Sequence, residues 1–357
     1  MGASGGCDFA GLGIDDLYRP IIPDPAPGFA DQGDPYMLTV PRSSGAEYAH
    51  YLYHTDVSHE GDRIPVYGSN DLRRFDYLGK ALRAEAPLSE HWAPCVVFNE
   101  STRRYDMFYS RSRPGQPNAD IGQRLRKAVA DRPEGPFVDQ GEFPLELETD
   151  FAIDADVYRK VDPQSGGSAP FLAYVVEFWH EARVGVGIVE VRLSDDLAKP
   201  VSSPRVLVKP SLDVQLYERD RSMPWQVGRR DWAAGETVDW HCIEAPIGGL
   251  VSPAGATYYL DSYGSYKDET YAVGAVREAP DGTVTDLAGE GHAVLRSGML
   301  DGITSAGHPS LVTPNLLVSH GRFSPQGERQ AFYVPLLWDE RDRPYCPDRD
   351  TLARLLA

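Results

Sequence analysis

The amino-acid sequence predicts an all-β fold, and within that class a five-bladed β-propeller. The first observation is composition: 34 glycines and 29 prolines in 357 residues exceed the usual combined share of about 12%, which favours short elements joined by tight turns. The second is a set of short segments rich in aromatic and β-branched residues. The third is a unit of strand, turn and strand that recurs along the chain, which indicates a repeat architecture.

The expected strands run through the chain from residue 35 onward. Each is bounded by Gly, Pro, Ser or Asp, the residues that interrupt strands. Amphipathic helical patterns are scarce, and the best candidate is residues 350–357 at the end of the sequence. The clearest strand segments are residues 35–40, 104–109, 171–176 and 257–260.

The repeated units follow one another at intervals of roughly 60 residues. The longest gap lies around residues 206–239, where residues 217–236 are expected to form a loop between blades. Such short strands are buried by packing as consecutive four-stranded blades around an axis, whereas a β-sandwich would not explain the recurrence. We therefore expect an N-terminal extension over residues 1–20, one propeller over residues 21–345 and a C-terminal tail over residues 346–357.

The chain is strongly acidic, with 53 Asp and Glu against 35 Lys and Arg and a formal charge of −18 at pH 7. Such a surface repels phosphate groups, so we expect no nucleic acid and no membrane as partners, and a small neutral ligand fits better. The first residues lack the basic and apolar regions of a secretory signal. We expect a cytoplasmic protein, and a secreted form whose leader has been removed stays open.

The cysteines lie far apart, without a CxxC pair or a neighbouring histidine cluster. This spacing argues against a zinc site and requires no disulfide framework. We expect reduced and mostly buried thiols. The four are Cys7, Cys95, Cys242 and Cys346.

Three acidic residues begin inner strands of the expected blades: Asp34, Asp154 and Glu244. Each lies among apolar or aromatic neighbours, a costly place for a charge that is neither paired nor used. In a propeller the inner strands surround one funnel, so these side chains are expected to converge although they are distant in sequence. A turn cap or the partner of a buried arginine is the alternative for each one taken singly.

Two carboxyl groups on either side of a sugar are the minimum machinery for hydrolysis of a glycosidic bond. One donates a proton to the leaving oxygen and the other activates water. A third carboxylate nearby would raise the pKa of the acid through like-charge repulsion. Asp156 lies two residues beyond Asp154 and shares its strand face, so it is the rival for this third role.

Short motifs recur in a fixed order along the chain, and at these residues the sequence resembles glycoside hydrolase family 43 over roughly residues 20–345. An arginine, Arg329, precedes the last strands. The Ile-Asp register of the third motif favours Asp154 over Asp156. The motifs are Gly33-Asp34-Pro35-Tyr36, Ser69-Asn70-Asp71-Leu72-Arg73-Arg74-Phe75, Trp92-Ala93-Pro94, Gly135-Pro136-Phe137, Ile153-Asp154, Glu244-Ala245-Pro246 and Gly307-His308.

The resemblance implies an inverting hydrolase in which Asp34 is the general base, Glu244 is the general acid and Asp154 tunes the pKa of the acid. It implies a small neutral saccharide or glycoside as substrate, chiefly a β-xyloside or an α-L-arabinofuranoside. The resemblance implies no required cofactor, and it leaves open a structural calcium on the propeller axis.

The resemblance also implies three residues around the sugar. Trp92 would supply an aromatic wall and Arg329 would contact the sugar in the innermost subsite. His308 would lie on the funnel floor, where it would also help to hold a calcium through water.

Two departures from the family pattern bear on specificity. Cys95 stands where an acid is usual, and Ile247 stands where an aromatic residue or histidine is common. Both are expected near the sugar pocket, which leaves the identity of the sugar open. A propeller that binds a glycan or a protein without cleaving it, and a retaining hydrolase of the fructan-cleaving type, remain alternatives.

Overall fold

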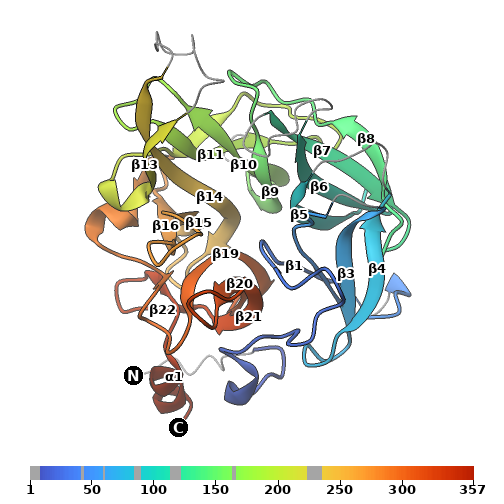
Figure 1. Ribbon diagram of the computed structural model, residues 1–357. Helices are drawn as coiled ribbons and strands as arrows, with labels where there is room; N and C mark the ends of the chain where they lie inside the picture. The colour runs from blue at the N-terminus through green and yellow to red at the C-terminus, as the bar shows by residue number, and fades with distance from the viewer. Residues whose placement is uncertain are drawn as a thin grey trace.

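The computed structural model describes residues 9–41, 44–58, 61–83, 90–112, 122–162, 166–222 and 235–357. Within these ranges the chain forms consecutive antiparallel sheets arranged as blades around a central axis (Figure 1). The fold is the five-bladed β-propeller that the sequence predicts. The innermost strands of the blades, in chain order, are β1 (Tyr36–Thr39), β5 (His91–Asn99), β9 (Ile153–Val161), β14 (Thr237–Val251) and β19 (Thr304–Thr313).

The remaining strands of each blade follow its inner strand outward from the axis. The segments expected as strands lie in β1, β6, β10 and β15. In blade order, the strands are β2 (His50–Tyr53), β3 (Arg63–Ser69) and β4 (Asp76–Leu82); β6 (Arg104–Ser112), β7 (Gln123–Ala130) and β8 (Val138–Glu142); β10 (Ser168–Phe178), β11 (Gly185–Arg192) and β12 (Arg205–Val208); β15 (Thr257–Tyr263), β16 (Ala272–Glu278), β17 (Val284–Asp286) and β18 (Leu295–Arg296); and β20 (Leu316–Arg322) and β21 (Gln330–Pro335).

Each inner strand is distorted by the same β-bulge at the axis. In blade 4, for example, the register passes from the pair Glu244 and Ser262 to the pair Ile247 and Leu260, so that three steps on one strand match two on the next. The residue after the start of each bulge has a positive φ, between 46° and 57°. We call it the left-handed position, and the residue before it the preceding position. The left-handed residues are Asp34, Ala93, Asp154, Ala245 and His308.

This conformation is unfavourable for residues other than glycine and costs of order 1–3 kcal/mol each. It persists where surrounding structure holds the backbone, and bulges of this kind re-aim side chains next to active sites. Four of the five left-handed residues are followed by proline. Its fixed φ restricts the backbone conformations available immediately after the left-handed residue. The sequence thus repeats one local distortion five times around the axis.

Hydrophobic clusters fill the spaces between neighbouring blades. Between blades 1 and 2, for instance, Tyr53 and Val66 pack with Val96 and Tyr109, all of them fully buried. Equivalent clusters lie at the other interfaces between described blades. Because each cluster draws on two blades, the blades stabilise one another and fix the axis that they surround.

The N-terminal segment closes the ring. The amide of Tyr18 donates to the carbonyl of Tyr333 at 3.0 Å, and Pro20 lies opposite Phe332 in an antiparallel bridge. Residues 9–20, expected as an extension, therefore lie against β21, the outermost named strand of blade 5, and Figure 1 shows the first described residues on the same side of the molecule as the C-terminus. The predicted C-terminal helix is present as α1 (Arg349–Leu356) and packs there through Leu352.

The expectation of a loop over residues 217–236 is wrong for its first part. Residues Leu216–Ser222 form β13, which pairs with the first half of β14, and residues 223–234 lie outside the described residues. The sequence Leu-Tyr-Glu-Arg-Asp-Arg-Ser has no apolar alternation to announce a strand. Short elements also surround the outer strands: η1 (Ile14–Asp16), η3 (Asp213–Gln215), η5 (Leu287–Glu290), β22 (Leu337–Trp338) and β23 (Pro344–Tyr345).

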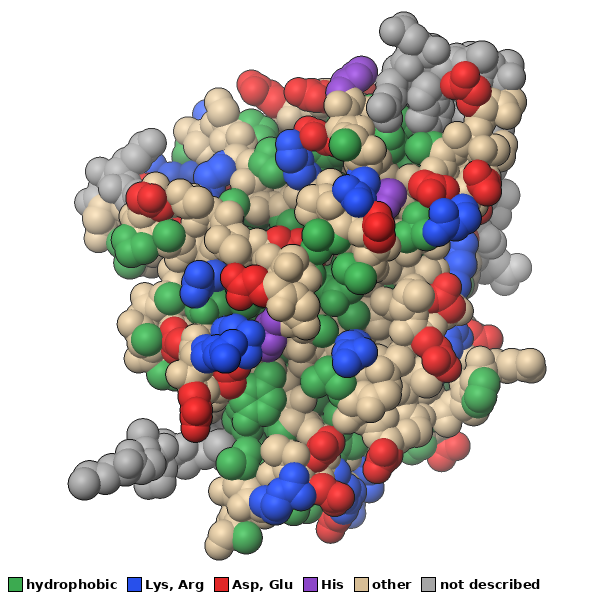
Figure 2. All heavy atoms as spheres, turned by 90° about the vertical axis from the view of Figure 1, so that its left-hand side faces the viewer, with side chains coloured by type: hydrophobic (Ala, Val, Ile, Leu, Met, Phe, Trp, Pro, Cys, Tyr) green, Lys and Arg blue, Asp and Glu red, His purple; other side chains and the backbone are tan. Residues whose placement is uncertain are grey.

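Acidic and basic side chains are interspersed on the side of the molecule that Figure 2 shows, which lies at the left of Figure 1. The net negative charge is therefore not gathered into a single acidic face on this side. Cys95, Cys242 and Cys346 are buried free thiols, as expected, and Cys7 lies outside the described residues. In the described part of the chain, none of the helices has the length and apolar character needed to cross a bilayer.

Candidate active site

The bulged ends of the inner strands surround a pocket of about 120 Å³ on the propeller axis. All six residues singled out from the sequence line it, although they come from five different blades. The pocket also has residues that the sequence did not indicate. Its lining consists of Asp34, Thr55, Val57, Glu90, Trp92, Ile153, Asp154, Glu244, Tyr266, His308 and Arg329.

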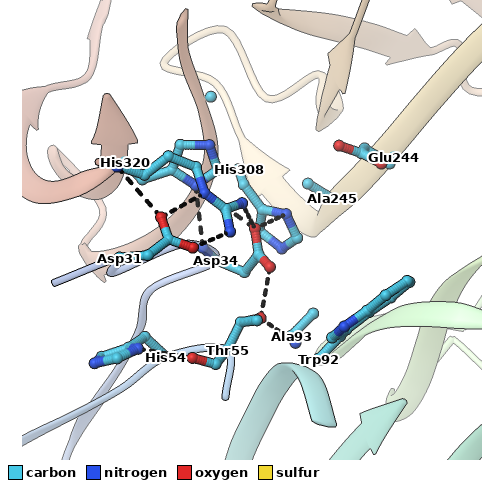
Figure 3. Close-up of polar contacts among 12 residues, drawn as sticks. Asp31, Asp34, His54, Thr55, Trp92, Ala93, Glu244, Ala245, His308 and His320 are labelled. Carbon is cyan, nitrogen blue, oxygen red and sulfur yellow. Dashed lines mark hydrogen bonds and ion pairs between the residues drawn. The ribbon is translucent and has the colours of Figure 1, made fainter. Parts of the chain in front are cut away.

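Asp34 occupies the left-handed position of blade 1 and lies at the centre of a network of polar contacts (Figure 3). Thr55 Oγ1 donates to its Oδ2 at 2.5 Å. His308 Nδ1 lies 3.1 Å from Oδ1, and Arg329 Nη1 lies 3.3 Å from the same oxygen. These contacts fix the orientation of the carboxylate and surround it with positive charge.

Asp34 and His308 each stabilise the charged form of the other. Burial raises the pKa of Asp34, but the charges of His308 and Arg329 overcome this effect and hold the pKa well below its ordinary value. Burial lowers the pKa of His308, but the carboxylates of Asp34 and Asp154 raise it to about 9. At neutral pH we therefore expect an ionised Asp34 paired with a protonated His308.

Arg329 and His320 complete the surroundings of Asp34. Arg329 is held by Asp31, whose carboxylate accepts from its Nε at 2.9 Å and from its Nη2 at 2.6 Å. His320 is fully buried, and burial together with the charge of Arg329 holds its pKa well below the ordinary value. The neutral ring of His320 accepts the backbone N–H of Asp34 through Nδ1 at 3.0 Å. The backbone and the side chain of Asp34 are both fixed.

Asp154 occupies the left-handed position of blade 3 and differs from Asp34 in its surroundings. Burial raises its pKa; His308 opposes this, the charges of Glu244 and Asp34 add to it, and the result is about 7. Its Oδ2 accepts the backbone N–H of Ala245 at 3.1 Å. Asp154 therefore contacts the residue next to Glu244 and places a titratable carboxyl beside the pocket.

Glu244 stands one residue before the left-handed position of blade 4, and its half-buried side chain lies apart from Asp34 across the opening (Figure 3). Its Oε1 accepts the phenol O–H of Tyr271 at 2.6 Å, and Cys242 Sγ lies 3.2 Å from Oε2. Burial, and next the charge of Glu244, raise the pKa of Cys242 well above its ordinary value, so the thiol stays protonated. Neutral groups thus hold Glu244, whereas cations hold Asp34.

Trp92 lies half-buried at the pocket, and its indole Nε1 donates to Glu90 Oε2 at 2.8 Å. The two departures from the family pattern are not among the residues that line this pocket. Ile247 lines a smaller cavity below it on the axis, and Cys95 is fully buried. The reason is the bulge: both residues come two positions after the left-handed residue and so point deeper into the molecule.

Sequence reasoning missed several residues of the site. Thr55, Tyr271 and Asp31 each hold one of the predicted residues, and Glu90 and Tyr266 line the pocket. Thr55 lies opposite Gly33, and Ser262 lies opposite Glu244, at the same place in their blades. An alignment of the five repeats at the second strand of each blade would have indicated this position.

The axial cavity below the pocket bears on the calcium expected from the sequence. Its volume is about 20 Å³, enough for about one water-sized occupant. Among the described residues, no group of three or more His, Cys, Asp or Glu side chains is placed to hold a metal. Since calcium prefers six to eight oxygen ligands, these residues do not fit a directly bound calcium ion, and a water-held ion through His308 stays a prediction.

A propeller funnel that brings carboxyl groups of contrasting ionisation to one pocket holds the groups that carbohydrate-cleaving enzymes use. The model of the glycosyl hydrolases family 43 matches residues 33–343. The chain belongs to this family of inverting O-glycosyl hydrolases, and the predicted family and fold are confirmed. None of the curated protein sequences compared with it matches.

Solved structures share the fold. A thermostable family-43 glycoside hydrolase matches with a TM-score of 0.67 and 24% identity, over 90% of this chain and 95% of that chain. An endo-1,4-β-xylanase from Bacteroides thetaiotaomicron VPI-5482 matches with a TM-score of 0.60 and 19% identity, over 89% and 95%. An endo-arabinase from the same organism matches with a TM-score of 0.60 and 20% identity, over 91% and 98%.

Proposed function

We propose that this glycosidase hydrolyses a β-xyloside or an α-L-arabinofuranoside, with Asp34 as general base, Glu244 as general acid and Asp154 as the residue that tunes the acid. The observation that carries the proposal is the contrast between the carboxyl groups of one pocket. Asp34 lies among cations that hold its pKa well below the ordinary value, whereas Glu244 accepts from the neutral phenol of Tyr271 and lies beside the neutral thiol of Cys242. Different environments for neighbouring carboxyl groups are what acid and base roles require.

Asp34 meets the needs of a general base. Its carboxylate remains ionised because His308 and Arg329 stabilise the charge, and Thr55 fixes the plane of the carboxyl group. A water at the pocket side of Asp34 would lose a proton to this carboxylate as its oxygen attacks the anomeric carbon. The attack comes from the face opposite the leaving group, so the configuration at that carbon inverts.

Glu244 meets the needs of a general acid better than Asp154 does. Its side chain is half-buried and lines the pocket, whereas that of Asp154 is only 5% exposed and is engaged with the Ala245 amide. Tyr271 donates to Oε1, and Oε2, which has only the weakly donating Cys242 thiol at 3.2 Å, is the oxygen that would carry the proton for the glycosidic oxygen. Asp154 accepts the amide of Ala245, so its carboxyl lies beside the backbone of Glu244, where the tuning role requires it.

The substrate class follows from charge and from the relatives. The pocket contains Asp34, Glu90, Asp154 and Glu244 as well as Arg329, a setting that suits the hydroxyl groups of a neutral sugar better than an anionic one. Structures of a xylanase and of an endo-arabinase share the fold. Xylosides and arabinofuranosides are therefore the first candidates.

The test is turnover of aryl xylosides, arabinofuranosides and galactosides by the purified protein, with proton NMR of the first-formed anomer. We expect turnover with inversion on a xyloside or arabinofuranoside. Asp34→Asn and Glu244→Gln should each lower kcat/KM by about 100-fold or more, the scale of a lost acid or base. Sugar binding without turnover would favour the non-catalytic alternative, and a retained first anomer would favour the fructan-type hydrolase.

A further inference from the structure

The strand that carries Glu244 is bulged twice within a few residues. The register of β14 against β15 shifts between Glu244 and Ile247, and shifts again between Ile247 and Leu250. Backbone amides within such bulges leave the strand ladder and need other acceptors. The position of the glutamate thus depends on what holds the bulged backbone.

Two carboxylates of the neighbouring strand β9 accept these amides. Asp154 Oδ2 accepts the N–H of Ala245 at 3.1 Å, and Asp156 Oδ2 accepts the N–H of Gly248 at 2.8 Å. Because both carboxylates accept backbone amides of β14, both aspartates project from β9 toward that strand. They hold the bulged segment on the C-terminal side of Glu244 at two points.

The side chain of Tyr158 follows on the same face and packs against the second bulge. A Cβ on Gly248 would lie 2.0 Å from its ring, so only glycine allows this approach. Gly249 has a positive φ of 69°. The Ile-Gly-Gly sequence that departs from the family pattern therefore fits the backbone to β9 rather than to a sugar.

Blade 5 provides a neutral counterpart of the Asp156 contact. Ser310 occupies in β19 the place that Asp156 occupies in β9, and its Oγ accepts the N–H of Met37 on the next blade at 3.1 Å. A hydroxyl group thus suffices to join two blades at this place. Hydrogen bonds to an ionised acceptor are about twice as strong as neutral ones, so the carboxylate of Asp156 restrains β14 more tightly.

The groups beside Asp156 are a thiol and two phenols. Tyr36 on β1, Cys95 on β5 and Tyr158 on β9 itself all have pKa values raised above the ordinary range, chiefly by burial. Burial also raises the pKa of Asp156 to about 7, against the effect of the Gly248 amide. Near neutral pH and above, the carboxylate is therefore available as an acceptor for Gly248.

We propose that Asp156 is a positioning residue for the general acid: by holding the Gly248 amide, it fixes the bulged segment of β14 so that Glu244 reaches the glycosidic oxygen. The inference rests on the proposed function. Asp156 contacts neither the sugar pocket nor the reacting atoms, since it lines only the lower axial cavity.

Substrates with different leaving groups can distinguish a role in positioning the general acid from a role in general support of the fold. A 2,4-dinitrophenolate leaves without protonation, whereas a phenolate benefits from a general acid, so a misplaced acid penalises phenyl glycosides selectively. The experiment measures kcat/KM for the 2,4-dinitrophenyl and phenyl glycosides of xylose and arabinofuranose. We expect Asp156→Ala to lose about 10-fold or more on the phenyl substrate and less than about 3-fold on the dinitrophenyl substrate.

Two further variants complete the design. Asp156→Asn keeps a carbonyl oxygen for the Gly248 amide and should return the ratio of the two substrates to within about 3-fold of the original. Ser310→Ala removes the matching contact on the side of the general base, and it should lower the rate on both substrates equally. Should Asp156→Ala not fold, Asp156→Leu fills the same space without an acceptor and is expected to show the same selectivity.

The outcomes separate the two proposals. An equal loss on both substrates, or no loss on either, in the Asp156→Ala or Asp156→Leu variant would overturn the positioning role while leaving the proposed function intact. A parent protein that hydrolyses none of the glycosides would instead contradict the proposed function, and the positioning role with it.

Discussion

The ion pair of His308 and Asp34 makes the stability of the propeller depend on pH in a defined direction. The Asp34 and Asp154 carboxylates outweigh burial and raise the pKa of His308 to about 9. The ordinary value, which applies in the unfolded chain, is about 6.5. Since the folded pKa is the higher one, this histidine stabilises the folded state fully below pH 6.5, and the contribution is lost as the pH rises through 9.

The size of the effect follows from the shift. A difference of about 2.5 pKa units at about 1.4 kcal/mol per unit gives about 3 kcal/mol at low pH. About 2 kcal/mol remain at pH 7.5 and almost none at pH 9.5. The window from pH 7.5 to 9.5 is the informative one, because Asp154 and Asp156, with pKa values of about 7, are already mostly ionised there.

Urea unfolding at pH 7.5 and 9.5 measures this contribution. The parent protein should lose about 2 kcal/mol more than His308→Gln does between these pH values. His180→Gln, at an exposed histidine, should behave as the parent does. A proton NMR titration of the His308 ring gives the pKa directly. A midpoint near 6.5, or equal pH dependence of the parent and the His308 variant, would refute the ion pair.

Three further predictions concern residues in and around the proposed catalytic site. Thr55→Ala should lower kcat about 10-fold or more without a large change in KM, because Asp34 loses the hydroxyl group that orients it. Thr55→Ser keeps a hydroxyl group and should restore most of the rate. Steady-state kinetics on one aryl glycoside measure both variants, and an unchanged kcat in Thr55→Ala would contradict the prediction. Asp154→Asn should change the pH–rate profile around pH 7, because the Asp154 carboxyl, with a pKa of about 7, no longer titrates beside the pocket. A profile that is unchanged around pH 7 would exclude the tuning role. Arg329→Lys keeps the charge but loses the two-point contact with its aspartate partner, so kcat/KM should fall by about 10-fold or more, and a variant with parent kinetics would show that the charge alone suffices.

The sequence predicts the fold and most of the pocket because both follow from repeats that local chemistry makes visible. Turn residues and aromatic strands recur, and the order of short motifs placed Asp34, Asp154 and Glu244 at blade starts. What it does not predict is register. Thr55 lies just beyond the end of the second strand of its blade, and Tyr271 lies just before the start of the third strand of its blade. Both contact the site, but no distinctive sequence motif lies beside them.

The bulge explains why the two departures from the family pattern lie near the pocket without lining it. A bulge adds one residue to the inner strand, so residues after the left-handed position turn toward the lower cavity instead of the sugar. Cys95 and Ile247 follow the bulge and lie below the pocket.

Residues at two adjacent positions of the repeat have different roles around the axis. The left-handed position supplies Asp34, Asp154 and His308, whose charges set one another's ionisation. The preceding position, one residue earlier, supplies side chains that face the pocket, among them Glu244 and Trp92.

Glycine at the preceding position leaves space for the side chains that hold Asp34 and Glu244. A Cβ on Gly33 would lie 2.1 Å from the guanidinium of Arg329, and a Cβ on Gly307 would lie 2.1 Å from the ring of Tyr271. These are the side chains that hold Asp34 and Glu244, respectively. Because the bulge recurs in every blade, the same distortion that positions Asp34, the proposed base, on one blade makes room on another for the residue that holds Glu244, the proposed acid. The proposed catalytic arrangement thus depends on the repeated bulge, and changes of side chain at two adjacent places are enough to give five similar strands different roles.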